Sequence, residues 1–404
     1  MEGAIEKLQI RRKMRLFLFG TVFALLSVIV PVLPADRMAA HPFSAAYTTL
    51  EFSKSNTRMV YSIDELSVIE LAGGDVDRNG MLDEREFDAV KETLVGVLQE
   101  HVVLRIGGSP QDWAGVENIE LERKGSATQA HVTVIFPPIA GDLTVSLNDT
   151  LYVGDPNTRY VNLLTVRYGE KYSTAALSES HRTWLIRLAE EEYAALPDVL
   201  EPRLEPEKED DPVNGTFMPE SVTSGAWSFF LLGVEHILGG YDHLLFLFTI
   251  LILRQSFKQY AIAISAFTVA HCTTLVLTVL GLLEVSPRLV EPLIALSICY
   301  VAVDNLVRKK TSANRWLPIF FFGLIHGMGF ADLLKEMQIP KNELALALFS
   351  FNIGIEVIQL AIAAAMWPVL TFLHRRKFSP QMVTAGSAIA LILGGLWLIE
   401  RIWV

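Results

Sequence analysis

The chain has 404 residues, of which 51% are hydrophobic and 20% charged, and its formal net charge is −11. So apolar a composition indicates that part of the chain lies in lipid, and an acidic chain without a basic groove excludes nucleic acid as a partner. The apolar residues gather beyond about residue 225, whereas 41–220 has the composition of a globular domain. Both cysteines, Cys272 and Cys299, lie in apolar runs, so we expect no disulfide in the soluble part.

The N-terminal segment 1–40 has the composition of a secretory signal. Four basic residues between Arg11 and Arg15 precede the apolar run 16–33, and small residues follow at 35 and at 39–40. This order predicts a signal peptide, and the length of the run leaves an uncleaved N-terminal anchor open. In either case the residues that follow are expected outside the cytoplasm.

Residues 41–198 are expected to form the extracytoplasmic domain, and the proline-rich acidic segment 199–224 a solvated linker. Short runs rich in Val, Thr, Tyr and Leu are separated by turn residues, a pattern that predicts a small β-sandwich. The predicted strands are 41–55, 100–106, 116–124, 130–136, 142–149 and 158–167. Residues 180–195 are predicted to be helical.

Residues 62–99 follow the EF-hand pattern of helix, calcium loop and helix. A capping box from Ser62 to Glu65 predicts a helix to about Ala72, and a second helix is expected over 83–99. Gly80 permits the sharp turn of the loop, and Leu82 is its apolar residue. The oxygen ligands expected for Ca²⁺ are Asp75, Asp77, Asn79, Met81 (through its carbonyl), Asp83 and Glu86. A single extracellular loop of this kind is expected to bind with a Kd on the order of 10⁻⁴–10⁻³ M.

The second half of the chain is predicted to be an all-α bundle of six transmembrane helices, over 225–404. Runs of this length cross the ~30 Å core of a bilayer as helices. They are 226–253, 258–282, 289–307, 317–334, 344–370 and 383–399. The first, third and fifth connections are basic, at 254–258, 308–315 and 375–377, and this places them in the cytoplasm. The first helix then enters from outside, in agreement with the signal segment, so a multi-pass cell-membrane protein is expected.

Ionisable side chains inside these runs are costly in lipid and indicate function. The middle of four helices carries His236 and His243, His271, His326 and Glu356. Imidazole and carboxylate at one level predict a site for Ni²⁺, Zn²⁺, Co²⁺ or a copper ion. On one continuous helix His236 and His243 would differ in height by about 10 Å, which favours two stacked sites, or successive stations on a path, over one shared ion. Glu235 and Asp242 are expected to support these ligands.

Two structural interpretations of the same residues remain open. Histidine, asparagine and threonine also link membrane helices by hydrogen bonds, and the Gly323 and Gly327 pair is expected to permit close helix packing. In addition, the spacing of Gly233, His236, Gly239 and Asp242 recurs at Gly323, His326, Gly329 and Asp332. The two copies lie on helices of opposite direction, which predicts an inverted repeat of three plus three helices.

At these residues the chain resembles the HupE/UreJ family of bacterial membrane proteins, in its larger form with an extracytoplasmic domain. The resemblance covers about 225–400 and rests on His236–Leu247, Phe267–His271, Ala295–Ile298, Phe322–Gly327 and Phe351–Glu356. It implies a permease for a transition metal, usually discussed as nickel in connection with hydrogenase and urease. The EF-hand departs from the plainest form of the family.

Three functions follow from these features, and a transporter is favoured over an enzyme. A divalent metal would enter past His236, His271, His326 and Glu356, and leave past His243, Asp304 and Asn305. The first alternative is an intramembrane zinc hydrolase, with three histidines on the metal and Glu356 or Asp242 as general base. The second is a calcium-responsive membrane sensor without chemistry.

Overall fold

The computed structural model describes residues 43–124, 127–155, 158–179, 181–200, 220–283, 285–307, 314–330 and 341–403. All of them belong to one compact unit, Pro42–Val404. The signal segment 1–40, most of the acidic linker and Asp332 lie outside the described residues.

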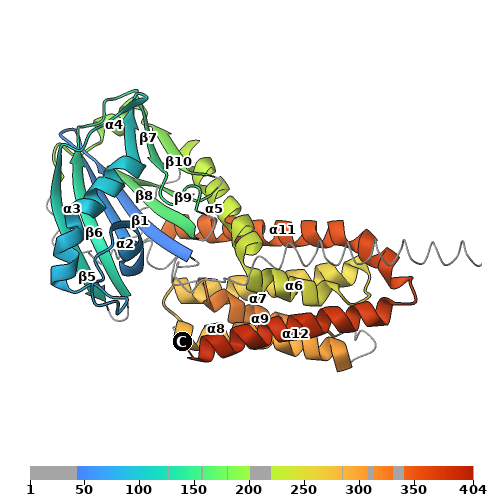
Figure 1. The fold of residues 1–404 in the computed structure, drawn as a ribbon. Coiled ribbons are helices and arrows are strands. Elements are labelled where there is room, and N and C mark those ends of the chain that lie inside the picture. The colour runs from blue at the N-terminus through green and yellow to red at the C-terminus, as the bar shows by residue number, and fades with distance from the viewer. Residues whose placement is uncertain are drawn as a thin grey trace, which may run out of the picture. The chain divides into compact units, whose positions relative to one another are not determined.

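The N-terminal region is rich in β-structure and holds two sheets (Figure 1). The strand order is β5-β6-β2-β1-β8-β9 in one sheet and β10-β7-β3-β4 in the other. Strands β1 and β8 pair in parallel, and the other described pairs are antiparallel. The strands are β1 (Phe43–Phe52), β2 (Thr57–Asp64), β3 (Val102–Ile106), β4 (Ser109–Pro110), β5 (Gly115–Lys124), β6 (Ala127–Phe136), β7 (Thr144–Asp149), β8 (Arg159–Tyr168), β9 (Lys171–Leu177) and β10 (Thr183–Arg187).

Both sheets contribute to one hydrophobic core. Tyr61 and Val132 reach it from the larger sheet, and Leu104 and Leu147 from the smaller one. Alternating burial along β2 and β3 shows why these strands have one inward face, since successive side chains point to opposite sides of a sheet. Helices α2 (Glu65–Ala72) and α3 (Glu84–His101) cover this core, and Leu94 is one of the residues that α3 buries.

Two local predictions in this region were wrong. Ser62 does not cap α2: it lies inside β2, and the carboxylate of Asp64 accepts the Ser67 N–H as the N-cap instead. The segment 180–195 is not one helix, because β10 occupies its first part and only the short α4 (Glu190–Ala194) follows. The alternation of buried Trp184 and Ile186 with exposed neighbours gives that strand its inward face.

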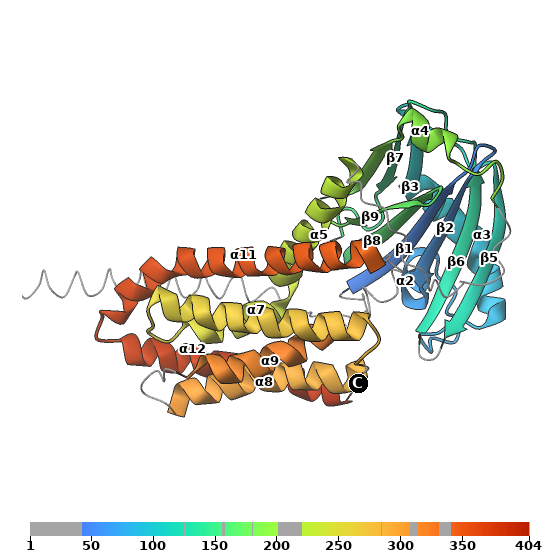
Figure 2. The same cartoon turned by 180° about the vertical axis from the view of Figure 1, so that it is seen from behind.

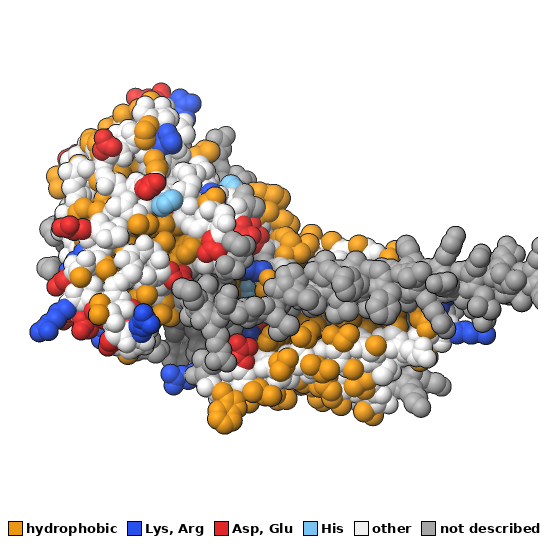
Figure 3. Space-filling view, in the orientation of Figure 1, with side chains coloured by type: hydrophobic (Ala, Val, Ile, Leu, Met, Phe, Trp, Pro, Cys, Tyr) orange, Lys and Arg blue, Asp and Glu red, His pale blue; other side chains and the backbone are white. Residues whose placement is uncertain are grey.

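The C-terminal region is helical (Figures 1 and 2). Four helices are long and apolar enough to cross a membrane, namely α7, α8, α11 and α12, and a bent pair, α5 with α6, passes the same test together. Figure 3 shows that on the face in view the helical region is mainly hydrophobic between its ends. The helices are α5 (Glu220–Gly239), α6 (Tyr241–Leu251), α7 (Phe257–Val279), α8 (Pro287–Val307), α9 (Trp316–Met328), α11 (Lys341–His374) and α12 (Ser379–Trp403).

The expectation of one straight first helix over 226–253 was wrong. The chain bends by 71° between α5 and α6, at Gly240. The fourth expected run is also shorter than predicted in the described residues, since α9 ends at Met328. The bend brings the His243 ring and the His236 carbonyl against Gly240, where a Cβ would not fit, and sharp bends in helices commonly occur at glycine.

Close helix packing at glycine holds the bundle together. A Cβ on Gly233 would lie 2.1 Å from the carbonyl oxygen of Phe351 in α11, and one on Gly323 would lie 2.5 Å from that of Phe267 in α7. Glycine thus allows α5 to pack closely on α11, and α9 on α7. In the predicted order of membrane helices these are the pairs one with five and four with two. An inverted repeat would produce this pairing.

The β-rich region and α5 share an apolar contact. Val161 and Leu163 of β8 are buried in one cluster with Phe229 and Leu232 of α5. The backbone N–H of Ala176 in β9 also donates to the hydroxyl of Ser228, at 3.0 Å. The larger sheet is thereby held against the helix that leads into the bend.

A buried carboxylate connects the two sheets. Asp149, the last residue of β7, is fully buried and accepts hydrogen bonds from the Tyr160 hydroxyl (2.6 Å) and the Asn162 amide (2.7 Å) of β8. The Leu151 N–H also donates to it, at 3.0 Å. Burial raises the pKa of the Asp149 carboxyl, and these hydrogen bonds offset the rise only in part.

The raised pKa of Asp149 predicts a pH-dependent stability of the β-rich region. The folded protein holds this proton more tightly than the unfolded chain. The stability that the folded protein gains by binding this proton is therefore fully present below the unfolded pKa of about 3.9. It is lost as the pH rises through the folded pKa. Within that window the free energy of unfolding should fall by up to about 1.4 kcal/mol per pH unit, and Asp149→Asn should remove this dependence.

Hydrogen exchange of the β8 peptide in the full-length protein measures this difference. The exposed Asp142, 83% exposed and paired with Arg187, provides the control variant Asp142→Asn. A stability difference between wild type and Asp149→Asn that stays constant from pH 4 upward would contradict the prediction.

Candidate metal centres

The bend at Gly240 brings two histidines of one chain segment together. A Cβ on Gly240 would lie 2.6 Å from Nδ1 of His243 and 2.8 Å from the carbonyl oxygen of His236, so only glycine fits. The rings of His236 and His243 lie 4.6 Å apart between centroids. The prediction that these side chains sit about 10 Å apart along one helix was therefore wrong, because the helix is broken between them.

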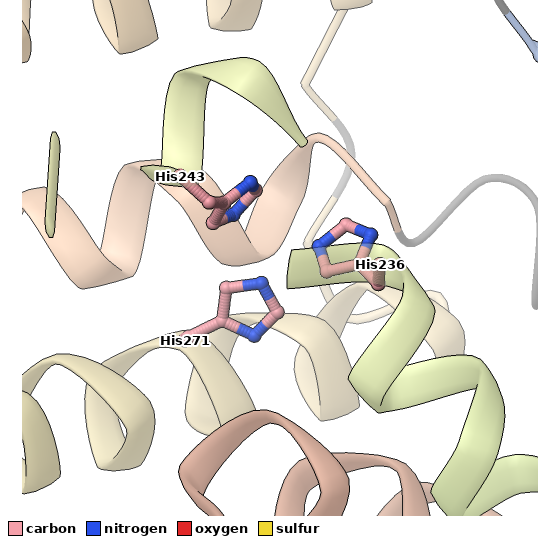
Figure 4. A group of neighbouring side chains, drawn as sticks. All are labelled: His236, His243 and His271. Carbon is pink, nitrogen blue, oxygen red and sulfur yellow. The ribbon is translucent and has the colours of Figure 1, made fainter. Parts of the chain in front are cut away.

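A third imidazole completes the group, His271 from α7. Its ring lies 5.9 Å from that of His236 and 6.1 Å from that of His243. One ligand nitrogen from each of the three rings lies within 4.8 Å of the other two. Figure 4 shows the rings turned toward one another, and we call these residues the three-histidine group.

Four of the six ring nitrogens of this group are buried and lack hydrogen-bond partners among the described residues. They are Nε2 of His236, Nε2 of His243 and both ring nitrogens of His271. A buried polar atom without a partner costs on the order of 1–3 kcal/mol. Phe330 and Phe351 flank His236, with ring centroids 4.3 and 5.5 Å away, so the surroundings are apolar. Three neutral imidazoles in such surroundings form a donor set that suits a transition-metal ion.

His326 of α9 adjoins the group, with its ring 5.0 Å from that of His243. The hydroxyl of Ser297 donates to the Ile294 carbonyl (2.6 Å) and lies 3.0 Å from Nε2 of His326. With its own proton engaged, Ser297 accepts from Nε2, which leaves a lone pair on Nδ1 of His326. That nitrogen is buried and has no partner among the described residues. Such a hydrogen bond fixes the tautomer and orientation of a metal-binding histidine.

The two carboxylates predicted to join the histidines lie elsewhere. Glu356 accepts a hydrogen bond from the Ser265 hydroxyl at 2.6 Å. Ser265 precedes His271 on α7 by six residues, which is about 9 Å of helix rise. Asp242 pairs with Arg401 of α12 at 2.7 Å, and Arg401 also lies 3.9 Å from Glu291 of α8.

Side chains of other helices satisfy the end of α6. The Thr249 carbonyl accepts from the Asn305 amide (2.9 Å) and from Arg315 (3.1 Å), and the Tyr260 hydroxyl donates to the Leu251 carbonyl (2.9 Å). Asn305, predicted as part of an exit path, thus anchors this short helix. Buried carbonyls at the end of a helix need such partners, because the helix itself offers none.

The acidic loop between α2 and α3 brings three of its predicted ligands together. Carboxylate oxygens of Asp75, Asp77 and Glu86 lie within 4.8 Å of one another. Gly80 has a φ of 77°, the left-handed turn for which glycine was expected, and its N–H donates to Asp75 at 3.0 Å. Asp83 caps α3, accepting the N–H of Glu86 at 2.8 Å.

The remaining loop residues hold its shape. The side-chain oxygen of Asn79 accepts the N–H of Met81, at 2.7 Å. Leu82 is fully buried, its N–H donates to Glu65 at 2.6 Å, and its carbonyl accepts from Arg123 at 2.5 Å. The loop backbone is therefore fixed on both sides by the surrounding domain.

Sequence reasoning missed several residues around the histidines. Arg159, Ser265 and Arg401 come from distant parts of the chain and lie beside Gly239, Glu356 and Asp242, respectively. An arginine near the end of the last apolar run was the one visible signal, because a cation at that position needs a partner.

Comparison with known proteins gave a family match in the helical region. Residues 214–401 match the family model described as HupE / UreJ protein. The match supports the HupE/UreJ resemblance for this part of the chain, and with the apolar helices it indicates a membrane protein. No curated protein matches the sequence.

Glycine packing next to the three-histidine group predicts a sensitive position. A Cβ on Gly327 would lie 2.2 Å from the His271 carbonyl oxygen and 2.3 Å from the Thr274 hydroxyl. Gly327→Ala should therefore push α9 from α7 and lower stability by about 1–3 kcal/mol, the usual effect of overpacking. Gly395→Ala is the control, because nothing lies within 4 Å of its added Cβ. Thermal unfolding of the purified variants in detergent measures the effect, and equal midpoints would contradict it.

Proposed function

We propose that this protein is a calcium-binding, multi-pass membrane protein that transports a transition-metal ion through an intramembrane histidine site. The three-histidine group carries the proposal, because its buried ring nitrogens converge without partners among the described residues. The family match supports the same class of function, since HupE/UreJ proteins are associated with nickel and metal transport.

The proposed topology has six crossings, with residues 41–198 outside the cytoplasm. It counts α5 and α6 as the first crossing and the predicted run 317–334 as the fourth. Basic residues at Arg254, Lys258 and 375–377 favour the cytoplasm for their connections. Residues 1–40 would direct the domain outward as a signal peptide or anchor.

The metal substrate would be Ni²⁺, Zn²⁺, Co²⁺ or a copper ion, all of which accept imidazole ligands. We place its first station at the three-histidine group and a second at His326, whose Nδ1 is free in the described structure. Glu356 and Asp242 would then contact the metal ion at other points along the path. Glu356 lies at the level of Ser265, and Asp242 lies beside Arg401.

The acidic loop would bind Ca²⁺ through Asp75, Asp77, Asn79, Met81, Asp83 and Glu86. Oxygen ligands suit this hard cation, and Leu82 fixes the loop to the β-rich region. Bound calcium would order that region.

A zinc hydrolase is the second candidate, because three histidines with an open position also suit catalytic zinc. The positions of the two carboxylates favour transport. Glu356 bonds to Ser265 and Asp242 pairs with Arg401, so neither carboxylate named as a general base belongs to the three-histidine group.

Removal of one imidazole should abolish transport. His271→Ala is expected to lower the initial rate of Co²⁺ or Ni²⁺ uptake into proteoliposomes by at least about tenfold, since even the loss of an outer partner of a metal ligand costs about 10–100-fold. His181→Ala in the β-rich region is the matched control. Uptake that is equal in wild type and His271→Ala would refute the proposed site, and turnover of a substrate without uptake would favour the hydrolase.

Calcium should stabilise the β-rich region through the acidic loop. With a Kd on the order of 10⁻⁴–10⁻³ M, 10 mM Ca²⁺ would add about 1.4–2.7 kcal/mol. Glu86→Gln should lose this gain. Glu84→Gln should keep it, because Glu84 is exposed and carries the same charge two residues away. Hydrogen exchange of α3 in the full-length protein, with and without Ca²⁺, measures the effect. A calcium response retained by Glu86→Gln would exclude the loop as its site.

A further inference from the structure

An arginine of the β-rich region lies on the helix break. Arg159 is the first residue of β8, and a Cβ on Gly239 would lie 1.3 Å from its Nη1. The guanidinium also lies over the ring of Tyr241, 5.2 Å from its centroid. Gly239 ends α5 and Tyr241 begins α6, so Arg159 contacts both sides of the bend.

The same guanidinium is close to the three-histidine group. It contacts Gly239, which lies three residues after His236 in α5. His236 is also the one member of the group that is partly exposed, while His243 and His271 are buried. Arg159 therefore lies near the partly exposed member of the group.

The larger sheet holds Arg159 in this place. Val161, two residues further along β8, is buried against α5 in the cluster with Phe229 and Leu232. On the neighbouring strand β9, Ala176 is bonded to Ser228 of α5. A side chain at the start of β8 is thereby fixed relative to the end of α5.

We propose that Arg159 is a cationic gate, which closes the outer approach to the three-histidine group and must withdraw before a metal ion enters. The inference rests on the proposed function. A guanidinium stays charged at all physiological pH values, and like charges repel strongly where little water screens them. The other nearby cation, Arg401, is offset by Asp242 and Glu291. Arg159 instead meets the ring face of Tyr241.

Cobalt binding to the purified full-length protein in detergent tests the gate. Co²⁺ bound to imidazole absorbs in the visible range, so a titration reports its Kd at the histidines. Arg159→Gln should lower the Kd by about tenfold or more, because one neighbouring positive charge is removed. Arg159→Lys keeps the charge and should retain a Kd near that of wild type, whereas a purely structural role of the guanidinium would not be rescued. Arg187→Gln, an exposed arginine of β10, is the control.

A second variant tests the position of the side chain without removing it. Gly239→Ala places a methyl group where the guanidinium lies, and so should displace Arg159 and also lower the Kd for Co²⁺. In the double variant Gly239→Ala with Arg159→Gln, the Kd should fall no further than in Arg159→Gln alone, since both changes clear the same approach.

The outcomes separate the gate from the proposed function. Tighter binding in Arg159→Gln that disappears when His271→Ala is added would support both. Binding that His271→Ala removes, but that Arg159→Gln leaves unchanged, would overturn the gate alone. Equal tightening in Arg159→Gln and Arg159→Lys would overturn the role of charge. Absence of Co²⁺ absorption in wild type and in every variant would overturn the gate together with the metal site.

Discussion

The break between α5 and α6 is the feature on which the helical region depends. On a continuous helix, seven residues would hold His236 and His243 about 10 Å apart. The 71° bend brings their rings to 4.6 Å and lets His271 join them. Gly240 permits this because any side chain there would collide with the His243 ring. The geometry of the group is therefore a consequence of one residue without a side chain.

The C-terminal end of α6, well beyond the break at Gly240, depends on side chains from the rest of the bundle. Asn305, Arg315 and Tyr260 bond to the last carbonyls of α6, which have no partner within the helix because it ends there. A buried carbonyl without a partner costs on the order of 1–3 kcal/mol. A polar residue within these helices can therefore have a structural role. Asn305, predicted as part of an exit path, holds the end of α6 through its hydrogen bond to the Thr249 carbonyl.

Local signals in the sequence predicted local structure well. The strands expected at 116–124 and 130–136 appear as β5 and β6, since alternating β-branched residues between turns suffice to specify a strand. The β-rich and helical regions and the family match were likewise anticipated. The bend at Gly240 was missed because glycine is common in straight membrane helices too. The partners of Glu356 and Asp242 were missed because Ser265 and Arg401 are 91 and 159 residues away in the chain.

Several polar residues of the helices have at least one hydrogen bond, although Oδ1 of Asn352 and Oε2 of Glu356 also lack a partner among the described residues. Within the described residues, Ser265 bonds to Glu356, Thr268 to the Ile264 carbonyl, and Asn352 to the Leu348 carbonyl. These contacts fit the role of links within and between helices. His271 differs, because both of its buried ring nitrogens lack a partner there. The Asn352 side chain of α11 also acts on His271, so a link between α7 and α11 accounts for part of this arrangement. A ligand that accepts nitrogen lone pairs from three rings would satisfy the ring nitrogens, which is why the histidines carry the proposed metal site.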